Sequence, residues 1–207
     1  QNFAFDHVKM SKRQVGSTFK PFVYSTAIQN GYSPCSEVAD NAYTFQVGEY
    51  GIPESWTPKN SDGYYTGCNV TLKYALANSM NSITSYIMKQ YGPQAVIDQA
   101  RAMGITSHLE PVPALCLGVA DLSVYEMVGA NASMVNKGVW IEPTMYTRVE
   151  DKFGNVIIDV RPKSNEAMSE ETAYAMLDLM KGIVDGEYNR CVGDYRKSLG
   201  KPPWYKI

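Results

Sequence analysis

One stretch of the sequence carries the groups on which both fold and chemistry depend, Arg13-Gln14-Val15-Gly16-Ser17-Thr18-Phe19-Lys20. Apolar side chains continue from it at helical spacing until Gly31, which predicts a helix that begins at Ser17. Residues three apart on a helix share one face, so we expect the Lys20 amine beside the Ser17 hydroxyl.

This pair is a candidate nucleophile and base. A serine is a poor nucleophile unless a neighbour takes its proton, and a lysine with a pKa near 10.4 does so at neutral pH only if burial or nearby cations lower that pKa. The Ser17 N–H at the helix start would stabilise an oxyanion, and Gly16 leaves the approach open. A capping serine followed by a solvated lysine is the alternative. The pattern S-x-x-K arises by chance in a chain of this size, and a second copy, Ser198–Lys201, lies among glycine and proline where no stable helix is expected.

Composition excludes several classes of protein. The 207 residues carry 19 Lys and Arg against 21 Asp and Glu, a formal charge of −2 that is not typical of a nucleic-acid-binding protein. A hydrophobic content of 44% with 19% charged residues excludes a disordered chain. With four cysteines and two histidines, none of them in a C-x-x-C pair, we expect no metal site and no cofactor.

The middle of the chain predicts a long irregular segment, 32–70, followed by helices. Leu72–Asn78 is the first of these, and Ser79–Asn81 breaks it. Ser82 is expected to cap a second helix that reaches Gly92, and Gln94–Met103 to form a third. A relay serine and a substrate-binding asparagine in the Ser79–Asn81 bend would serve catalysis, and an ordinary cap and turn is the alternative.

The second half predicts helices and one hairpin. Ser123 and Glu126 form a capping box that opens a helix ending at Gly138. The strands Met145–Val149 and Val156–Val160 flank a turn, and a last helix runs from Ser169 to about Val184. Helices with some strand, not in βαβ alternation, predict an α+β fold.

Several blocks together resemble a known family. They are Arg13–Phe22, the W-x-P-x-N-x-x-G segment Trp56–Gly63, Thr71–Asn81, and the helix Ser123–Gly138. In this order, over about residues 13–186, they resemble the transpeptidase domain of class A penicillin-binding proteins. The resemblance implies the fold shared with β-lactamases, a helical cluster packed with an antiparallel sheet, of which part would be missing here.

The resemblance also implies an activity and its residues. Members are D,D-transpeptidases that cross-link peptidoglycan stem peptides ending in D-Ala-D-Ala, through a serine acyl-enzyme that β-lactam antibiotics trap. By position, Ser17 is the nucleophile, Lys20 its base and Ser79 the proton relay, while Asn81 and Lys201 bind substrate. The resemblance implies a location on the outer face of the cytoplasmic membrane, and a membrane anchor and glycosyltransferase domain outside this chain. From the charge balance we expect no nucleic acid as a partner.

One family motif departs from the pattern. Lys-Thr-Gly is expected near Lys201, but Pro202 and Pro203 follow it, and proline cannot donate a hydrogen bond to a strand ladder. We therefore expect an incomplete transpeptidase domain over 1–186, a divergent or displaced segment over 187–207, and weak or absent catalysis. A D,D-carboxypeptidase or β-lactamase-type hydrolase, and a catalytically impaired peptidoglycan-binding domain, remain alternatives.

Overall fold

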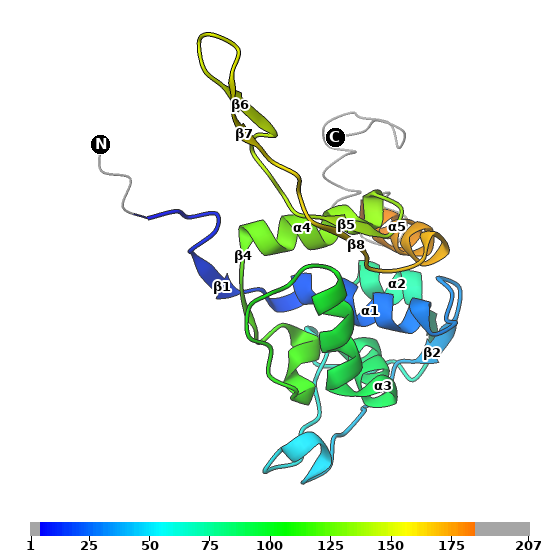
Figure 1. The fold of residues 1–207 in the computed structure, drawn as a ribbon. Helices are drawn as coiled ribbons and strands as arrows, with labels where there is room; N and C mark the ends of the chain where they lie inside the picture. The colour runs from blue at the N-terminus through cyan, green and yellow to red at the C-terminus, as the bar shows by residue number, and fades with distance from the viewer. Residues whose placement is uncertain (1–4, 185–207) are drawn as a thin grey trace, which may run out of the picture.

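Helix α1 (Lys20–Gln29) forms the centre of the fold (Figure 1). In the computed structural model, which describes residues 5–184, it continues directly from the 3-10 helix η1 (Gly16–Phe19). It packs between α3 (Asn81–Ala102) and α5 (Glu170–Val184), and all its residues but the last are buried. The predicted helix from Ser17 is thus confirmed, with its first turn wound more tightly than an α-helix.

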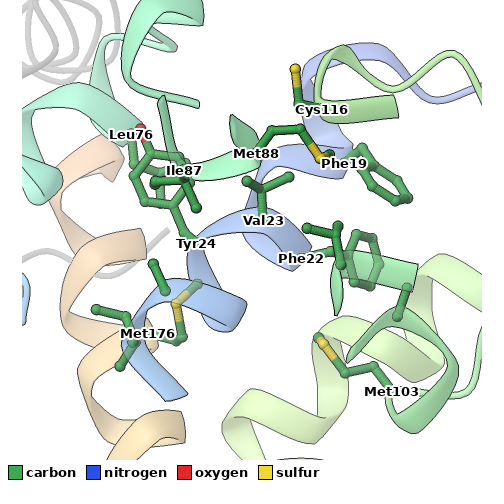
Figure 2. Packing of buried hydrophobic residues seen from close by; sticks show 14 of the residues in the cluster. Phe19, Phe22, Val23, Tyr24, Leu76, Ile87, Met88, Met103, Cys116 and Met176 are labelled. Carbon is green, nitrogen blue, oxygen red and sulfur yellow. The ribbon is translucent and has the colours of Figure 1, made fainter. Parts of the chain in front are cut away.

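The core around α1 is apolar (Figure 2). Its members include Phe19, Phe22 and Tyr24 of η1 and α1, Leu76 of α2 (Leu72–Ala77), Ile87 and Met88 of α3, and Met176 of α5. Full burial of one such side chain stabilises the fold by about 1.5–3 kcal/mol. Packing on every side therefore fixes α1, and with it the position of Lys20.

Helix α3 corrects one expectation. The predicted break near Gly92 is present as a kink, where Gly92 has a φ of 80° and Pro93 follows. Ser82, however, does not cap the helix. The N-cap residue is Met80, and the hydroxyl of Ser82 donates to Asp40. The prediction was wrong because Asn60, from a distant loop, accepts hydrogen bonds from the first N–H groups of the helix. Local sequence does not reveal such a partner.

Within residues 5–184, four short two-stranded antiparallel sheets surround the helices. They pair β1 (Lys12–Gln14) with β4 (Asp121–Ser123), β2 (Glu37–Ala39) with β3 (Asn69–Thr71), β5 (Val139–Ile141) with β8 (Ser164–Glu166), and β6 (Arg148–Glu150) with β7 (Val156–Asp159). Only β6–β7 was predicted, and Figure 1 shows it projecting away from the helices. The pair β2–β3 closes the ends of the segment 32–70, which also holds the short 3-10 helix η2 (Glu49–Gly51).

The later helices agree with the sequence. Helix α4 (Val124–Val135) begins with the predicted capping box of Ser123 and Glu126, and α5 begins after Ser169. Between α3 and β4 lies the 3-10 helix η3 (Pro113–Leu117). Among the described residues, no helix is long and apolar enough to cross a membrane. The segment predicted as divergent, 187–207, lies outside the described residues.

Candidate active site

Lys20 is the centre of the site. Its side chain is 1% exposed, although it is the first residue of α1. The Nζ atom donates to the backbone oxygen of Ser79 at 2.6 Å, to Ser79 Oγ at 2.9 Å and to Asn81 Oδ1 at 2.7 Å. The structure thus brings together three of the predicted site residues, from segments 59 and 61 positions apart in the chain.

Burial gives this lysine an unusual electrostatic state. Loss of water around the amine disfavours its charged form and lowers the pKa of Lys20 to about 8, against a smaller opposing effect of Cys116 on η3. The Cys116 thiol is itself buried, which raises its pKa to about 12. A lysine with a pKa near 8 is neutral in a useful fraction at physiological pH, as a general base must be.

Ser17 lies on η1 and is exposed. Together with Lys20 and Ser79 it lines a cavity of about 770 Å³, whose apolar walls include Met127 of α4 and Ile183 of α5. The backbone N–H of Lys20 donates to the backbone oxygen of Ser17, which closes the turn of η1. Among the described residues no side-chain hydrogen bond joins the two, and the Lys20 amine donates to the Ser79–Asn81 bend. The two side chains share one cavity, and a substrate placed there would meet both.

A close backbone contact sets the approach to Ser17. Gly16 has a φ of 54°, and its N–H donates to the backbone oxygen of Gly118 at 3.0 Å. A side chain on Gly118 would place its Cβ 2.0 Å from the Gly16 oxygen. Only glycine at 118 therefore allows η3 to lie against the residue before the candidate nucleophile. The sequence showed Gly118 but gave no sign of this role.

The Ser79–Asn81 bend is strained and externally supported. Ser79 has a φ of 52°, a left-handed conformation that costs a residue with a side chain about 1–2 kcal/mol. Asn60 Oδ1 accepts from the N–H groups of Asn81 and Ser82, at 2.9 and 3.0 Å. The W-x-P-x-N-x-x-G segment thus caps α3 and holds the bend, rather than serving as a plain connector.

Sequence reasoning missed Asp40, the buried acceptor that anchors this support, because no motif marked it. The predicted substrate residue Lys201 lies outside the described part of the chain, and its role stays a prediction. Cys35, Cys68 and Cys116 are free thiols, and residues 5–184 contain no cluster of three or more metal-ligating side chains.

Comparison with known proteins gives the family of the chain. Residues 8–110 match the family model of the penicillin binding protein transpeptidase domain. The chain is 34% identical to penicillin-binding protein 2D of Bacillus subtilis (strain 168) over 91% of its own length and 27% of that protein. It spans about a quarter of the length of the curated relatives it matches.

Solved structures agree with the predicted fold. Penicillin-binding protein 1A from Haemophilus influenzae superposes with a TM-score of 0.82 at 23% identity, over 95% of this chain and 34% of that one. The penicillin G acyl-enzyme complex of penicillin-binding protein A from M. tuberculosis gives 0.71 at 20% identity, over 86% and 45%. The α+β fold of the penicillin-binding transpeptidases is confirmed, and the chain belongs to the family of penicillin-binding protein transpeptidase domains.

Proposed function

We propose that this chain is a D,D-transpeptidase domain that cross-links peptidoglycan stem peptides through an acyl-enzyme on Ser17. The observation that carries the proposal is the buried Lys20 amine, with a pKa lowered to about 8, held by Ser79 and Asn81 on a cavity that Ser17 also lines. Membership of the penicillin-binding family supports it, as does the penicillin G acyl-enzyme complex of the similar penicillin-binding protein A from M. tuberculosis.

The reaction assigns one step to each side chain. Neutral Lys20 takes the Ser17 proton while the serine oxygen attacks the carbonyl carbon of the D-Ala–D-Ala bond. The carbon–nitrogen bond breaks, and the leaving D-Ala amine receives its proton through Ser79. The amine of a second stem peptide then attacks the ester, an amide forms, and the oxygen of Ser17 leaves with a proton. Asn81 binds a substrate amide.

Three hydrogen bonds at Nζ match the three N–H groups of the protonated lysine. On deprotonation, two N–H groups still satisfy the Ser79 and Asn81 oxygens. The hydroxyl of Ser79 can then turn to donate to the free lone pair, since a hydroxyl is both donor and acceptor. Ser79 is therefore suited to pass protons between Lys20 and a bound amine.

Labelling with a fluorescent penicillin tests the proposal. We expect a covalent mass increase on Ser17 that persists for the length of the assay, with Ser17→Ala as the unlabelled control. Rapid loss of the adduct would instead indicate a hydrolase, and no adduct would indicate a peptidoglycan-binding domain. Label that persists in Ser17→Ala would disprove the assigned nucleophile.

The remaining expectations form part of the same proposal. Action on peptidoglycan places the domain outside the cytoplasm, at the outer face of the membrane, and β-lactams are its expected inhibitors. Lys201 is proposed to bind the substrate carboxylate. The stopped-flow rate of Ser17 acylation, compared with that of an intact homologue, measures the weak catalysis expected from the altered Lys-Thr-Gly region, and equal rates would show this expectation wrong.

A further inference from the structure

Asp40 is a buried carboxylate that no step of the proposed reaction uses. It follows β2, and its side chain is 1% exposed. Among the described residues no cation forms an ion pair with it. A charge removed from water without a partner is costly unless hydrogen bonds replace the lost water.

Four hydrogen bonds from three residues replace that water. Ser82 Oγ and Asn60 Nδ2 donate to Asp40 Oδ1 at 2.6 and 2.9 Å, and Thr66 donates to Oδ2 through its backbone N at 2.8 Å and its hydroxyl at 3.0 Å. Burial opposes ionisation, but these bonds outweigh it and hold the pKa of Asp40 below its usual value. One carboxylate thus joins β2, the 56–67 loop and α3.

The 56–67 loop connects Asp40 to the residues that bind Lys20. Asn60, held by Asp40, accepts from the N–H groups of Asn81 and Ser82. Asn81 Nδ2 donates to the backbone oxygen of Lys59 at 2.7 Å, which turns Asn81 Oδ1 toward Lys20. Two hydrogen-bonded residues therefore connect the carboxylate to the amine.

We propose that Asp40 is a positioning residue for Lys20, holding the strained Ser79–Asn81 bend against the amine and keeping water from it. The inference deepens the proposed function, since it assigns how the base of that reaction is kept in place. Without the carboxylate, Asn60 and Ser82 lose their common acceptor. Nothing else among the described contacts ties the loop to the start of α3 through a buried charge.

The consequence concerns the protonation of the lysine. Because burial is the largest cause of its low pKa, a bend that opens to water raises the pKa of Lys20 from about 8 toward the ordinary value. The other titratable group acting on the amine is Cys116 of η3, and Arg13 of β1 lines the same cavity. Neither contacts Asp40, so neither explains a shift that follows its replacement.

The test is an NMR titration of the Lys20 side chain in the full chain, assigned with Lys20→Met. Asp40→Asn keeps the size of the side chain but loses the charge, and its amide N–H₂ faces existing donors. In this variant we expect the titration midpoint of Lys20 to rise by at least about half a pH unit. Asp62→Asn is the matched control, since Asp62 is exposed on the same loop and, among the described residues, accepts a hydrogen bond only from the backbone N–H of Tyr64. A folded Asp40→Asn protein with an unchanged midpoint would overturn the proposal.

A second variant covers the case in which Asp40→Asn does not fold. Ser82→Ala deletes one of the four hydrogen bonds, and we expect a smaller shift in the same direction. An unchanged midpoint there would also count against the proposal.

Penicillin labelling separates this inference from the proposed function. If Ser17 is labelled, Asp40→Asn should slow labelling most at pH 7, and the labelling rate should recover toward pH 10. An equal slowing at every pH would refute the positioning role of Asp40. If native Ser17 is not labelled, the proposed function fails while the Lys20 titration still decides the role of Asp40.

Discussion

At the scale of single residues, the central feature is a buried lysine with a lowered pKa that lines the same cavity as a serine. With a pKa of about 8, roughly a tenth of Lys20 is neutral at pH 7, against less than about a thousandth for a free lysine. The neutral fraction of Lys20 at pH 7 is therefore about a hundred times that of a free lysine. Burial at the start of α1 therefore does what the sequence motif alone cannot.

The first prediction is a pH dependence. Acylation of Ser17 by penicillin should rise about tenfold per pH unit up to pH 8, where Lys20 becomes mostly neutral, and level off above it. Stopped-flow rates between pH 6 and 10 provide the measurement. A rate that stays flat between pH 6 and 9 would show that another group activates the serine.

The second prediction concerns Gly118, whose φ is 75° and whose added Cβ would overlap the Gly16 backbone. We expect Gly118→Ala to lose at least about 2 kcal/mol more stability than Gly154→Ala, because two backbone segments must separate. Gly154 is a matched control with a φ of 85° and open space around it, so its replacement costs only about 1–2 kcal/mol.

Urea unfolding of both variants measures the difference, and penicillin labelling of the folded fraction reports on Ser17. Equal stability of the two alanine variants would mean that the Gly16–Gly118 contact is not needed.

At the scale of elements, the sequence predicted the helices but not most of the strands. Helical spacing and caps lie within one element, so α2, α5 and the capping box of α4 were predicted. The strands β1 to β5 and β8 have three residues each, too few to show alternation, and pair across long distances in the chain. Ser82 failed as a cap for the same reason, since its true partner is Asp40.

The third prediction tests the capping box. Glu126 accepts hydrogen bonds from Thr106, Ser107 and Ser123. Burial raises the pKa of this carboxyl group, but the hydrogen bonds outweigh it and lower the pKa to about 2. This stabilisation is complete above the unfolded pKa near 4.5 and is lost as pH falls toward 2. At pH 7 we expect Glu126→Gln to lower the free energy of unfolding by about 1.5–3 kcal/mol, the usual contribution of hydrogen bonds to a charged group.

Denaturant unfolding at pH 7 and pH 3 checks the sign, because the gap between native and variant should narrow as pH falls. Glu110→Gln, at an exposed carboxylate, should show no such gap. A gap that stays constant from pH 7 to pH 3 would contradict the assigned charge.

At the scale of the whole molecule, the site is assembled from segments that the sequence shows separately. The motifs of Ser17, Lys20, Ser79 and Asn81 were visible because each is short and local. Ser79 and Asn81 meet the Lys20 amine because α1 packs against α3, and the bend that carries them is supported through Asp40. A lone aspartate in an irregular segment carries no pattern, so only the folded chain shows that it belongs to the site.

The final prediction separates this helical body from the β6–β7 hairpin. Every residue of both strands is exposed, including Ile157 at 63%, and the turn residue Phe153 is 76% exposed. Thr147 and Val160 are already joined at the base by a backbone hydrogen bond of 2.8 Å. Replacing residues 148–159 with two glycines should therefore change the melting temperature by less than about 3 °C and leave Ser17 labelling intact.

The contrast is Met176→Ala in the core under α1, which should cost about 2–5 kcal/mol because it leaves a cavity that the packed helices cannot fill. Differential scanning fluorimetry of the two variants, with labelling at matched folded fractions, measures both effects. Loss of labelling in the shortened protein would mean that the hairpin acts on the site after all, and that the helices around α1 do not hold Lys20 unaided.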